Sequence, residues 1–198
     1  FERTEHGWFE AHVYPHEDTM STFIVECHEQ TYLAHGLDRM SLPESLAFSE
    51  QVFAKLLGGA RMIGNARHPR GSQWLNFVRV LNQRWAYGNF VLMGDAAHTA
   101  HFSIGSGTKL AMEDAIALAA AVEAHPTDVP RALLAYEEAR RLDVLKVQRA
   151  AQTSLEWFEN SARYQTQSPV RFVFNLMTRS RRITYDNLRL RDPALIAR

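Results

Sequence analysis

The sequence predicts a mixed fold of the α/β (α+β) class, and three observations support this prediction. Two segments near the start, residues 8–14 and 21–27, alternate apolar and polar side chains with the period of a β-strand. Residues 90–93 are apolar at every position, as in a parallel strand that is covered on both faces. From residue 107 onward, apolar residues recur every three to four positions, which is typical of helices.

Each element has its own local signal. The strand over 21–27 places Phe23, Val25 and Cys27 on one face. A helix is expected to begin after Ser41, which suits an N-cap, and to stop at the glycine pair 58–59. Strand-like apolar runs then predict strands over 74–81 and 89–93.

Three helices are predicted in the second half. One begins near Gly107 and is broken by Pro126 and Pro130, a second long helix follows, and Pro169 opens a shorter one. The apolar stripes expected to face the core are Ala111, Ala115, Leu118 and Val122 in the first helix, and Ala135, Ala139, Leu142 and Leu145 in the second.

The composition limits the classes of function. With 198 residues, 46% of them hydrophobic, the chain suggests one domain or a piece of a larger one. Twenty-two basic and 22 acidic side chains give a net charge of zero, which argues against a whole-chain electrostatic grip on nucleic acid or an anionic membrane. The single cysteine excludes an internal disulfide and a thiolate zinc cage. No apolar run reaches the roughly 18 residues of a membrane span, and the acidic start is unlike a signal peptide, so we expect a soluble, cytoplasmic protein.

The zero net charge conceals an asymmetry. Residues 1–130 carry 9 basic and 15 acidic side chains, a net of −6, whereas residues 131–198 carry 13 basic and 7 acidic, a net of +6. The basic half either offers a surface to an anionic partner or only separates helical arms from a sheet.

Residues 94–109 carry the chemistry. Asp95 stands at the end of the expected apolar strand, small residues follow, and Gly105-Ser106-Gly107 leads into a helix. Ligands of α/β folds bind outside the carboxyl ends of strands. A helix N-terminus offers unpaired N–H groups and positive dipole charge. The segment therefore predicts a site for a nucleotide-like or polyol-containing ligand.

The spacing of this segment resembles a known family. Gly94-Asp95-Ala96-Ala97-His98, Gly105-x-Gly107 and Glu113-Asp114-Ala115 together resemble the second flavin motif of the FAD-dependent aromatic hydroxylases, which have the para-hydroxybenzoate hydroxylase fold. The likeness continues upstream through Trp85 and downstream through Tyr136-Glu137-x-x-Arg140-Arg141. His101-Phe102 and Lys109 replace the usual prolines and asparagine, and this form is similar to the branch that acts on aromatic CoA thioesters. Hydroxylases of indole pigment pathways share a similar element, so the substrate class stays open.

The resemblance implies FAD as cofactor, with Asp95 binding the ribityl hydroxyls. The remaining cofactor-binding candidates are Gly94, Ala96, Ala97, Gly105, Ser106, Gly107, Thr108 and Lys109. The backbone N–H groups of residues 107–109 would face the C2 carbonyl and N1 of the flavin ring, where reduced flavin carries negative charge. Lys109 either adds positive charge there or projects to solvent.

The implied reaction is aromatic hydroxylation. NAD(P)H reduces the flavin, dioxygen adds at C4a, and the hydroperoxide attacks the substrate ring. His101 is the catalytic candidate, because it would hydrogen-bond a substrate hydroxyl or amino group; the alternative is a structural hydrogen bond within its loop. Phe102 and Ser103 are the substrate-contact candidates. His98-x-x-His101 predicts no metal, because a third ligand is not evident, and His98 is interpreted as structural.

Two basic clusters are candidates for the phosphates of CoA. Arg179, Arg181 and Arg182 form the better one, because arginine pairs with phosphate in bidentate geometry; the alternative is a solvated tail. Arg61, Arg67 and Arg70 form the second.

The chain has no Gly-x-Gly-x-x-Gly motif for the ADP part of FAD. The resemblance therefore implies the second half of an enzyme that is inactive alone, with either a missing N-terminal half or a second copy of the chain as partner. Residues 1–84 would be the C-terminal part of the substrate-binding sheet domain, 85–128 the second flavin motif and 129–198 a C-terminal helical region. The alternative is a small non-catalytic module that keeps the scaffold for binding.

Overall fold

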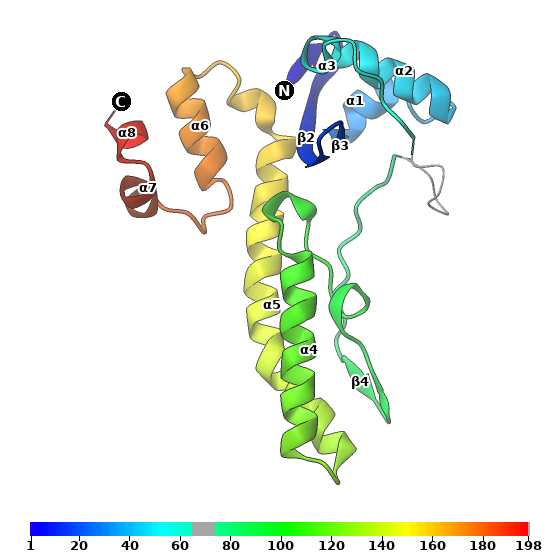
Figure 1. Cartoon of the computed structure of the whole chain (residues 1–198), viewed down its shortest axis with the longest axis vertical. Helices are drawn as coiled ribbons and strands as arrows, with labels where there is room; N and C mark the ends of the chain where they lie inside the picture. The colour runs from blue at the N-terminus through cyan, green and yellow to red at the C-terminus, as the bar shows by residue number, and fades with distance from the viewer. Residues whose placement is uncertain (65–73, 198) are drawn as a thin grey trace. The chain divides into compact units, whose positions relative to one another are not determined.

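The computed structural model describes residues 1–64 and 74–197 (Figure 1). The chain divides into two compact units: a first unit of Phe1–Leu75 with Ser161–Arg163, and a second unit of Asn76–Asn160 with Tyr164–Arg198. Arg67 and Arg70 of the second basic cluster lie outside the described residues.

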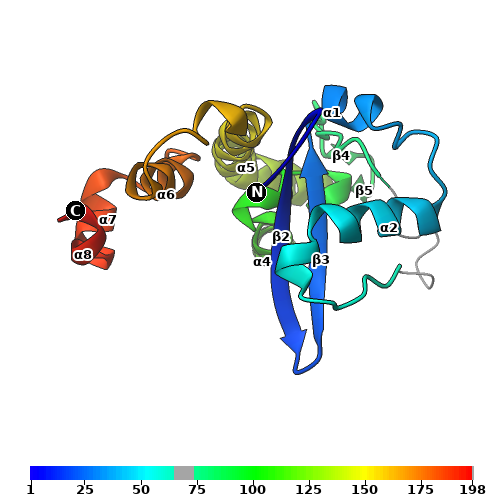
Figure 2. The ribbon, with the colours of Figure 1, turned by 90° about the horizontal axis from the view of Figure 1, so that it is seen from above.

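The first unit contains a three-stranded antiparallel sheet in the order β1 (Glu2–Thr4), β2 (Gly7–Glu17), β3 (Met20–Cys27). Figure 2 shows β2 and β3 side by side. Their register pairs Phe9 with Cys27 and Ala11 with Val25. The predicted strands over 8–14 and 21–27 are therefore confirmed, with the apolar faces that the alternation indicated.

Three helices cover this apolar face: α1 (Glu29–Ala34), α2 (Leu42–Val52) and α3 (Ala54–Leu57). Their core surrounds Phe9, Leu37 and Phe53. The predicted start at Ser41 is confirmed by a capping box with Glu44, and Gly58 ends α3 at a φ of 57°. A break at Phe53 divides the expected helix in two. The short 3₁₀ turn η3 (Ser161–Arg163) also belongs to this unit.

Two long helices, α4 (Gly107–Ala124) and α5 (Val129–Glu159), lie side by side along the second unit (Figure 1). Asp128 caps α5, and Pro130 stands in its first turn rather than breaking a helix. Trp85 and Ala97, which precede α4 in the sequence, form one core with Leu110 of α4 and Tyr136 of α5.

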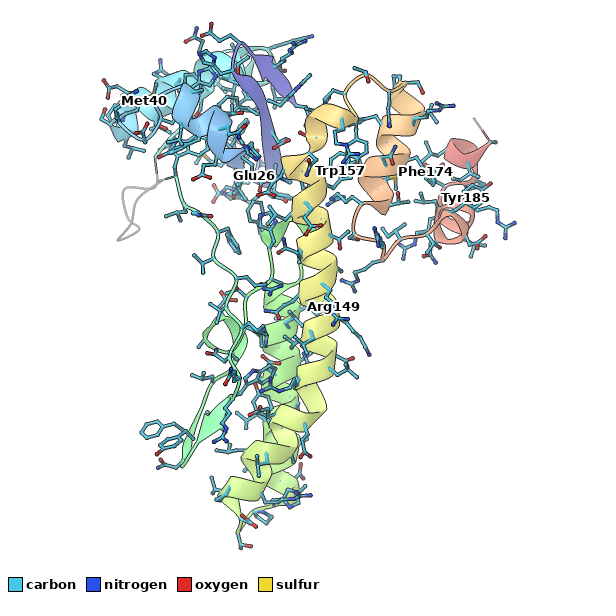
Figure 3. The ribbon with its side chains drawn as sticks, turned by 180° about the vertical axis from the view of Figure 1, so that it is seen from behind. Glu26, Met40, Arg149, Trp157, Phe174 and Tyr185 are labelled. Atoms are coloured by element: carbon cyan, nitrogen blue, oxygen red, sulfur yellow. The ribbon has the colours of Figure 1, made fainter. Side chains whose placement is uncertain are left out.

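Three shorter helices follow: α6 (Pro169–Thr178), α7 (Tyr185–Arg191) and α8 (Pro193–Ile196). The predicted helix start at Pro169 is confirmed. Trp157 on α5 faces α6 (Figure 3), where its ring centroid lies 5.8 Å from that of Phe172. Phe174 of α6 and Tyr185 of α7 also contact each other, with ring centroids 6.4 Å apart. Aromatic contacts therefore connect α5 to α6 and α6 to α7.

The predicted stripes are confirmed only in part: Leu118 of α4 and Ala135 of α5 pack against the core, whereas other stripe residues do not. Val122 of α4 and Leu142 of α5 belong to those stripes, yet 47% and 62% of their surfaces are exposed. The buried face of α4 instead includes Asp114, which pairs with the buried Arg140 of α5. Apolar spacing misses this part of the core face because two charged residues occupy it.

The strand predictions for residues 74–81 and 89–93 are largely wrong. Residues 74–81 form no strand and make only an isolated bridge between Leu81 and His98. The apolar run becomes β5 (Phe90–Val91), which pairs antiparallel with β4 (Ala86–Tyr87). Phe90 is 74% exposed, and within residues 1–64 and 74–197 β5 pairs with β4 alone. A parallel, doubly covered strand is therefore not what these residues form.

Across the same described ranges, none of the helices combines the length and the hydropathy needed to cross a membrane.

Candidate functional site

The predicted Gly-Asp motif forms the tight turn η1 (Gly94–Ala96) directly after the β5 segment. Gly94 is buried and has a φ of +57°, a conformation that side chains rarely adopt. A Cβ at this position would lie 3.2 Å from the Cβ of Ala111 on α4. Asp95, the next residue, is exposed, whereas Ala97 is fully buried. Glycine thus brings the turn close to α4 while the Asp95 carboxylate stays accessible.

The buried carboxylate of Asp114 holds this turn in place. Asp114 is fully buried and accepts hydrogen bonds from the Gly94 N–H at 3.0 Å, from Nε2 of His98 at 2.7 Å and from Nε of Arg140 at 2.9 Å. The structural interpretation of His98 is confirmed. One carboxylate therefore ties the turn, the following residues and α5 to α4.

Glu113 extends the network toward the surface. Its carboxylate accepts hydrogen bonds from the Lys109 ammonium and, at 2.9 Å, from Nη2 of Arg140. These two cations hold the pKa of Glu113 below its ordinary value against the opposing effect of burial. Lys109 thus makes an ion pair along α4.

The N-terminus of α4 has no side-chain cap. The preceding turn η2 (Phe102–Ile104) ends at Gly105, which has a φ of +61°. Ser106, the N-cap residue, donates its hydroxyl to the Ile104 carbonyl at 3.4 Å and accepts from Nη1 of Arg182 at 3.3 Å. The first-turn N–H groups of residues 107–109 therefore suit an external hydrogen-bond acceptor.

His101, the catalytic candidate, lies in a buried hydrogen-bonded chain. Its Nδ1 is 2.9 Å from Oγ of Ser103, and that oxygen is 2.9 Å from Oγ of Ser154 on α5. Nε of Arg179 donates to Oγ of Ser154 at 2.9 Å. The structure brings together His101 and Ser103 of the predicted site with Arg179 of the predicted CoA cluster.

The other substrate and CoA candidates are more dispersed. The His101 ring lies against Phe102, with centroids 4.5 Å apart, and edge-on to Phe77 at 5.2 Å. Arg181 is exposed, and Arg182 reaches Ser106. Contact of these arginines with CoA phosphates stays a prediction.

Sequence reasoning gave no role to Asp114, Arg140 or Ser154. Asp114 and Arg140 lie within the motifs that carry the family resemblance. Charged residues at core-facing helix positions could have indicated that these two form a buried pair. Ser154 begins the stretch Ser154-Leu155-Glu156-Trp157-Phe158-Glu159, which also resembles the thioester branch, but that likeness assigns the serine no role.

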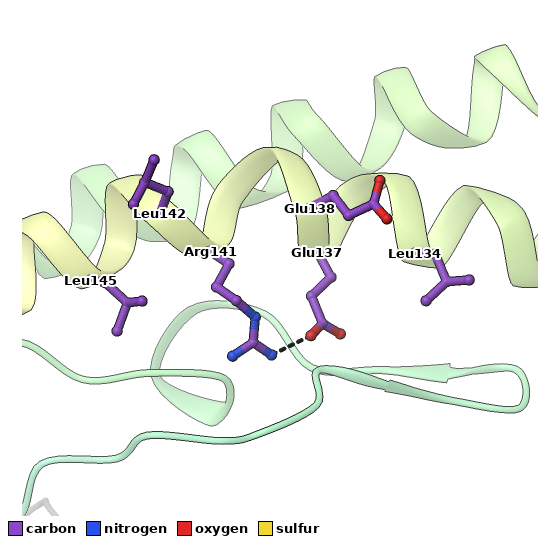
Figure 4. A pocket seen from close by; sticks show the side chains of 6 residues that line it. All are labelled: Leu134, Glu137, Glu138, Arg141, Leu142 and Leu145. Atoms are coloured by element: carbon purple, nitrogen blue, oxygen red, sulfur yellow. Dashed lines mark hydrogen bonds and ion pairs between the residues drawn. The ribbon is translucent and has the colours of Figure 1, made fainter.

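A surface pocket on α5 is separate from these residues (Figure 4). Its lining consists of Leu134, Glu137, Glu138, Arg141, Leu142 and Leu145. Glu137 and Arg141 pair with each other; Glu137 also accepts from the Trp85 N–H at 2.8 Å, and Arg141 donates to the Asn82 carbonyl at 3.4 Å. The pair therefore anchors the segment before β4, and no predicted site residue lines the pocket.

The two histidines of the motif hydrogen-bond other side chains: His98 contacts the Asp114 carboxylate, and His101 contacts the Ser103 hydroxyl. In the first unit, Glu5, His6 and His35 place potential ligand atoms within 4.8 Å of one another. Nε2 of His35 is, however, 2.8 Å from the Thr4 hydroxyl. Glu5 and His6 of this cluster are exposed, which is unlike a built metal site, whose ligands are held by surrounding groups.

Comparison with known proteins places this geometry in a family. Residues 44–151, more than half of the chain, match the family described as FAD binding domain. The chain belongs to the FAD-dependent aromatic hydroxylases. FAD fits the residues of this hydroxylase chain, since the exposed Asp95 suits ligand hydroxyls and the uncapped helix N-terminus suits the acceptor edge of the flavin ring.

Three relatives illustrate how much of such a hydroxylase the chain represents. It is 42% identical to salicyloyl-CoA 5-hydroxylase of Streptomyces sp., over 98% of this chain and 38% of the relative. It is 42% identical to 3-hydroxy-4-methyl-anthranilyl-(aryl-carrier protein) 5-monooxygenase of Streptosporangium sibiricum, over 90% and 44%. It is 39% identical to protodeoxyviolaceinate monooxygenase of Chromobacterium violaceum, over 83% and 43%. The chain thus spans less than half the length of each of these relatives.

Proposed function

We propose that this chain closes the flavin site of an NAD(P)H-dependent aromatic monooxygenase whose substrate is an aromatic acyl thioester such as salicyloyl-CoA. The observation that carries the proposal is the Gly94–Asp95 turn, locked by Asp114 and adjoined in sequence by the uncapped start of α4. We assign residues 1–84 to the substrate-binding sheet, 85–128 to the second flavin motif and 129–198 to the C-terminal helices.

Different residues of the chain would bind different parts of the cofactor. Asp95 would accept hydrogen bonds from the ribityl hydroxyls, and the N–H groups of residues 107–109 would donate to the carbonyl side of the ring. When bound and reduced by NAD(P)H, FAD supplies the activation of dioxygen. The helix dipole of α4 would favour negative charge on the ring, because the positive end of a helix lies at its N-terminus, where these N–H groups are.

The thioester substrate is supported by two of the relatives. Salicyloyl-CoA and an anthranilyl group on an aryl-carrier protein are both aromatic acyl groups on a carrier, and both carry an electron-donating substituent on the ring. Protodeoxyviolaceinate, named in the third relative, is not described as a thioester. The exposed Arg181 is the member of the CoA cluster best placed to meet a phosphate.

Replacing Asp95 with alanine is expected to weaken FAD binding roughly tenfold to a hundredfold, because hydrogen bonds to a charged acceptor contribute about 1.5–3 kcal/mol. The measurement is a flavin-fluorescence titration of the full reading frame that encodes this chain. Asp18→Ala, which removes an exposed carboxylate from the β2–β3 turn, is the matched control. Equal affinities in Asp95→Ala and the unchanged protein would exclude the assigned role.

Substrate class is tested with the same protein. Flavin-dependent NAD(P)H oxidation and ring hydroxylation are expected with salicyloyl-CoA and to be much slower with free salicylate. Equal rates would argue against the thioester. Absence of both flavin absorbance and NAD(P)H oxidation would favour a non-catalytic binding module instead.

A further inference from the structure

We propose that Arg179 and Arg182 are positioning residues: they hold the segment 103–106, and with it the N–H groups at the start of α4 that the proposed function assigns to FAD. We call residues 179–182, which follow α6, the C-terminal clamp. The clamp and the segment both belong to the second unit. The role toward FAD rests on the proposed function, whereas the role of holding the segment does not.

Two hydrogen bonds join the C-terminal clamp to the segment. Nη2 of Arg179 donates to the Ser103 carbonyl at 2.7 Å. Nη1 of Arg182 donates to Oγ of Ser106 at 3.3 Å. Both bonds connect residues 76 positions apart, so the two stretches run alongside each other in the same direction. Both serines are buried, and an unmade hydrogen bond at a buried polar group is costly.

The glycines of the segment explain why it needs such contacts. Gly105 has a φ of +61°, and a Cβ at Gly105 or at Gly107 would meet no atom within 4 Å among the residues that the structure describes. Glycine also restricts its own backbone less than any other residue. The place of the segment therefore depends on the bonds that Ser103 and Ser106 make on either side of Gly105.

The clamp is anchored by Arg179. Its Nε donates to Oγ of Ser154 on α5 at 2.9 Å, and its Nη1 donates to the Leu176 carbonyl at 2.6 Å. The guanidinium carbon also lies 5.0 Å from the centroid of the Phe158 ring. Arg179 therefore connects the segment to α5 and to the end of α6.

The backbone between the two arginines adopts a conformation that side chains disfavour. Arg181 has a φ of +58° and is the one residue other than glycine with a positive φ in residues 1–64 and 74–197. Its N–H donates to the Thr178 carbonyl at 2.9 Å, which closes a tight turn. A left-handed residue of this kind persists only where surrounding contacts outweigh its cost. The bonds of Arg179 and Arg182, which flank Arg181, can supply that compensation.

The clamp acts on the cofactor site through Ser106. The Ser106 carbonyl accepts from the Leu110 N–H at 3.0 Å, so the place of Ser106 sets where the first turn of α4 begins. The N–H groups of residues 107–109 follow directly. Displacing them would weaken the binding of reduced flavin more than that of oxidised flavin, because the reduced ring carries the negative charge that these donors favour.

The first test is hydrogen exchange, followed by mass spectrometry, on the flavin-free protein made from the full reading frame that encodes this chain. The reporter amides are those of Gly105 and Leu110, which donate to carbonyls of the η2 turn and of Ser106. In Arg182→Met both should exchange about threefold to tenfold faster, because a bond from a charged donor is lost. The free energy of unfolding should stay unchanged, because Arg182 is exposed. Arg182 is changed rather than Arg179, since Arg179 also bonds α5 and α6.

Two further variants assign the effect to this contact. Arg189→Met is the matched control, because Arg189 lies on α7 and pairs with Asp186 at 3.5 Å; the reporter amides should exchange as in the unchanged protein. Ser106→Ala removes the acceptor of the contact and should speed exchange as Arg182→Met does. The double variant should add little to either single change, which a general loss of stability would not produce.

The second test is the reduction potential of bound flavin. In Arg182→Met, reduced flavin should lose about threefold to tenfold more affinity than oxidised flavin, which is measured as a more negative potential, whereas Arg189→Met should leave the potential unchanged. Unchanged exchange in Arg182→Met, or additive effects in the double variant, would overturn the holding role. Faster exchange with an unchanged potential would overturn the role toward FAD. A protein that binds no flavin would contradict the proposed function and the role toward FAD, while the exchange data would still decide whether the clamp holds the segment.

Discussion

Replacing Asp114 with alanine is expected to lower the free energy of unfolding by about 3–5 kcal/mol, because it leaves the buried Arg140 guanidinium without its main partner. Asp114 is fully buried, and Arg140 is 7% exposed. The substitution also removes the acceptor of the Gly94 N–H and of His98 Nε2. Chemical denaturation monitored by tryptophan fluorescence measures the change, since Trp85 packs in the same core.

Two further variants identify the cause of this loss. Asp143→Ala removes an exposed carboxylate that pairs with Lys146 on the surface of α5, and no measurable change is expected. The double variant Asp114→Ala/Arg140→Met removes both charges and should recover part of the stability. An Asp114→Ala protein as stable as the unchanged chain would show that the network does not hold the turn.

Local patterns predicted the elements whose partners are adjacent in sequence. The alternation over residues 8–14 and 21–27 predicted β2 and β3, because a hairpin brings its own partner strand. Ser41 and Gly58 marked helix ends through hydrogen bonds within a few residues. The prediction for residues 90–93 failed for the opposite reason. An apolar run indicates only that both faces of a strand would suit burial, whereas strand pairing depends on segments distant in sequence.

The residues of the candidate site also fall into two groups: those that local spacing could predict and those whose partners are distant in sequence. Gly94, Asp95 and the glycines before α4 stand in a short motif, so their place could be predicted from spacing. The Asp114–Arg140 pair joins residues 26 positions apart on different helices, and the Ser154–Ser103 contact spans 51 positions. No local period encodes such contacts. The CoA assignment of Arg179 shows the consequence, because a cluster of arginines in sequence does not reveal which of them is already engaged by the fold.

Replacing Glu10 with glutamine is expected to stabilise the chain increasingly as the pH rises from about 5 to 8. Burial is the main cause that raises the pKa of Glu10 from 4.5 to about 8; the cross-strand Glu26 adds to the rise, while the Ser161 hydroxyl and the N-terminal ammonium oppose it. Between these two pKa values, the folded chain keeps a proton that the unfolded chain has lost. The stability of the unchanged protein therefore falls with rising pH across this window, by at most about 1.4 kcal/mol per pH unit.

Glutamine keeps the shape and the hydrogen-bonding carbonyl but does not ionise, so the stability of Glu10→Gln should be much flatter between pH 5 and 8. The advantage of glutamine over glutamate is expected to grow by on the order of 3 kcal/mol across that range. Urea denaturation at several pH values measures it. Glu17→Gln, at the exposed end of the same strand, is the matched control and should follow the pH profile of the unchanged chain. Parallel profiles for Glu10→Gln and the unchanged chain would mean that Glu10 is already ionised in the folded state at pH 5, and its environment would then have to be less apolar than the sheet and Ser161 make it.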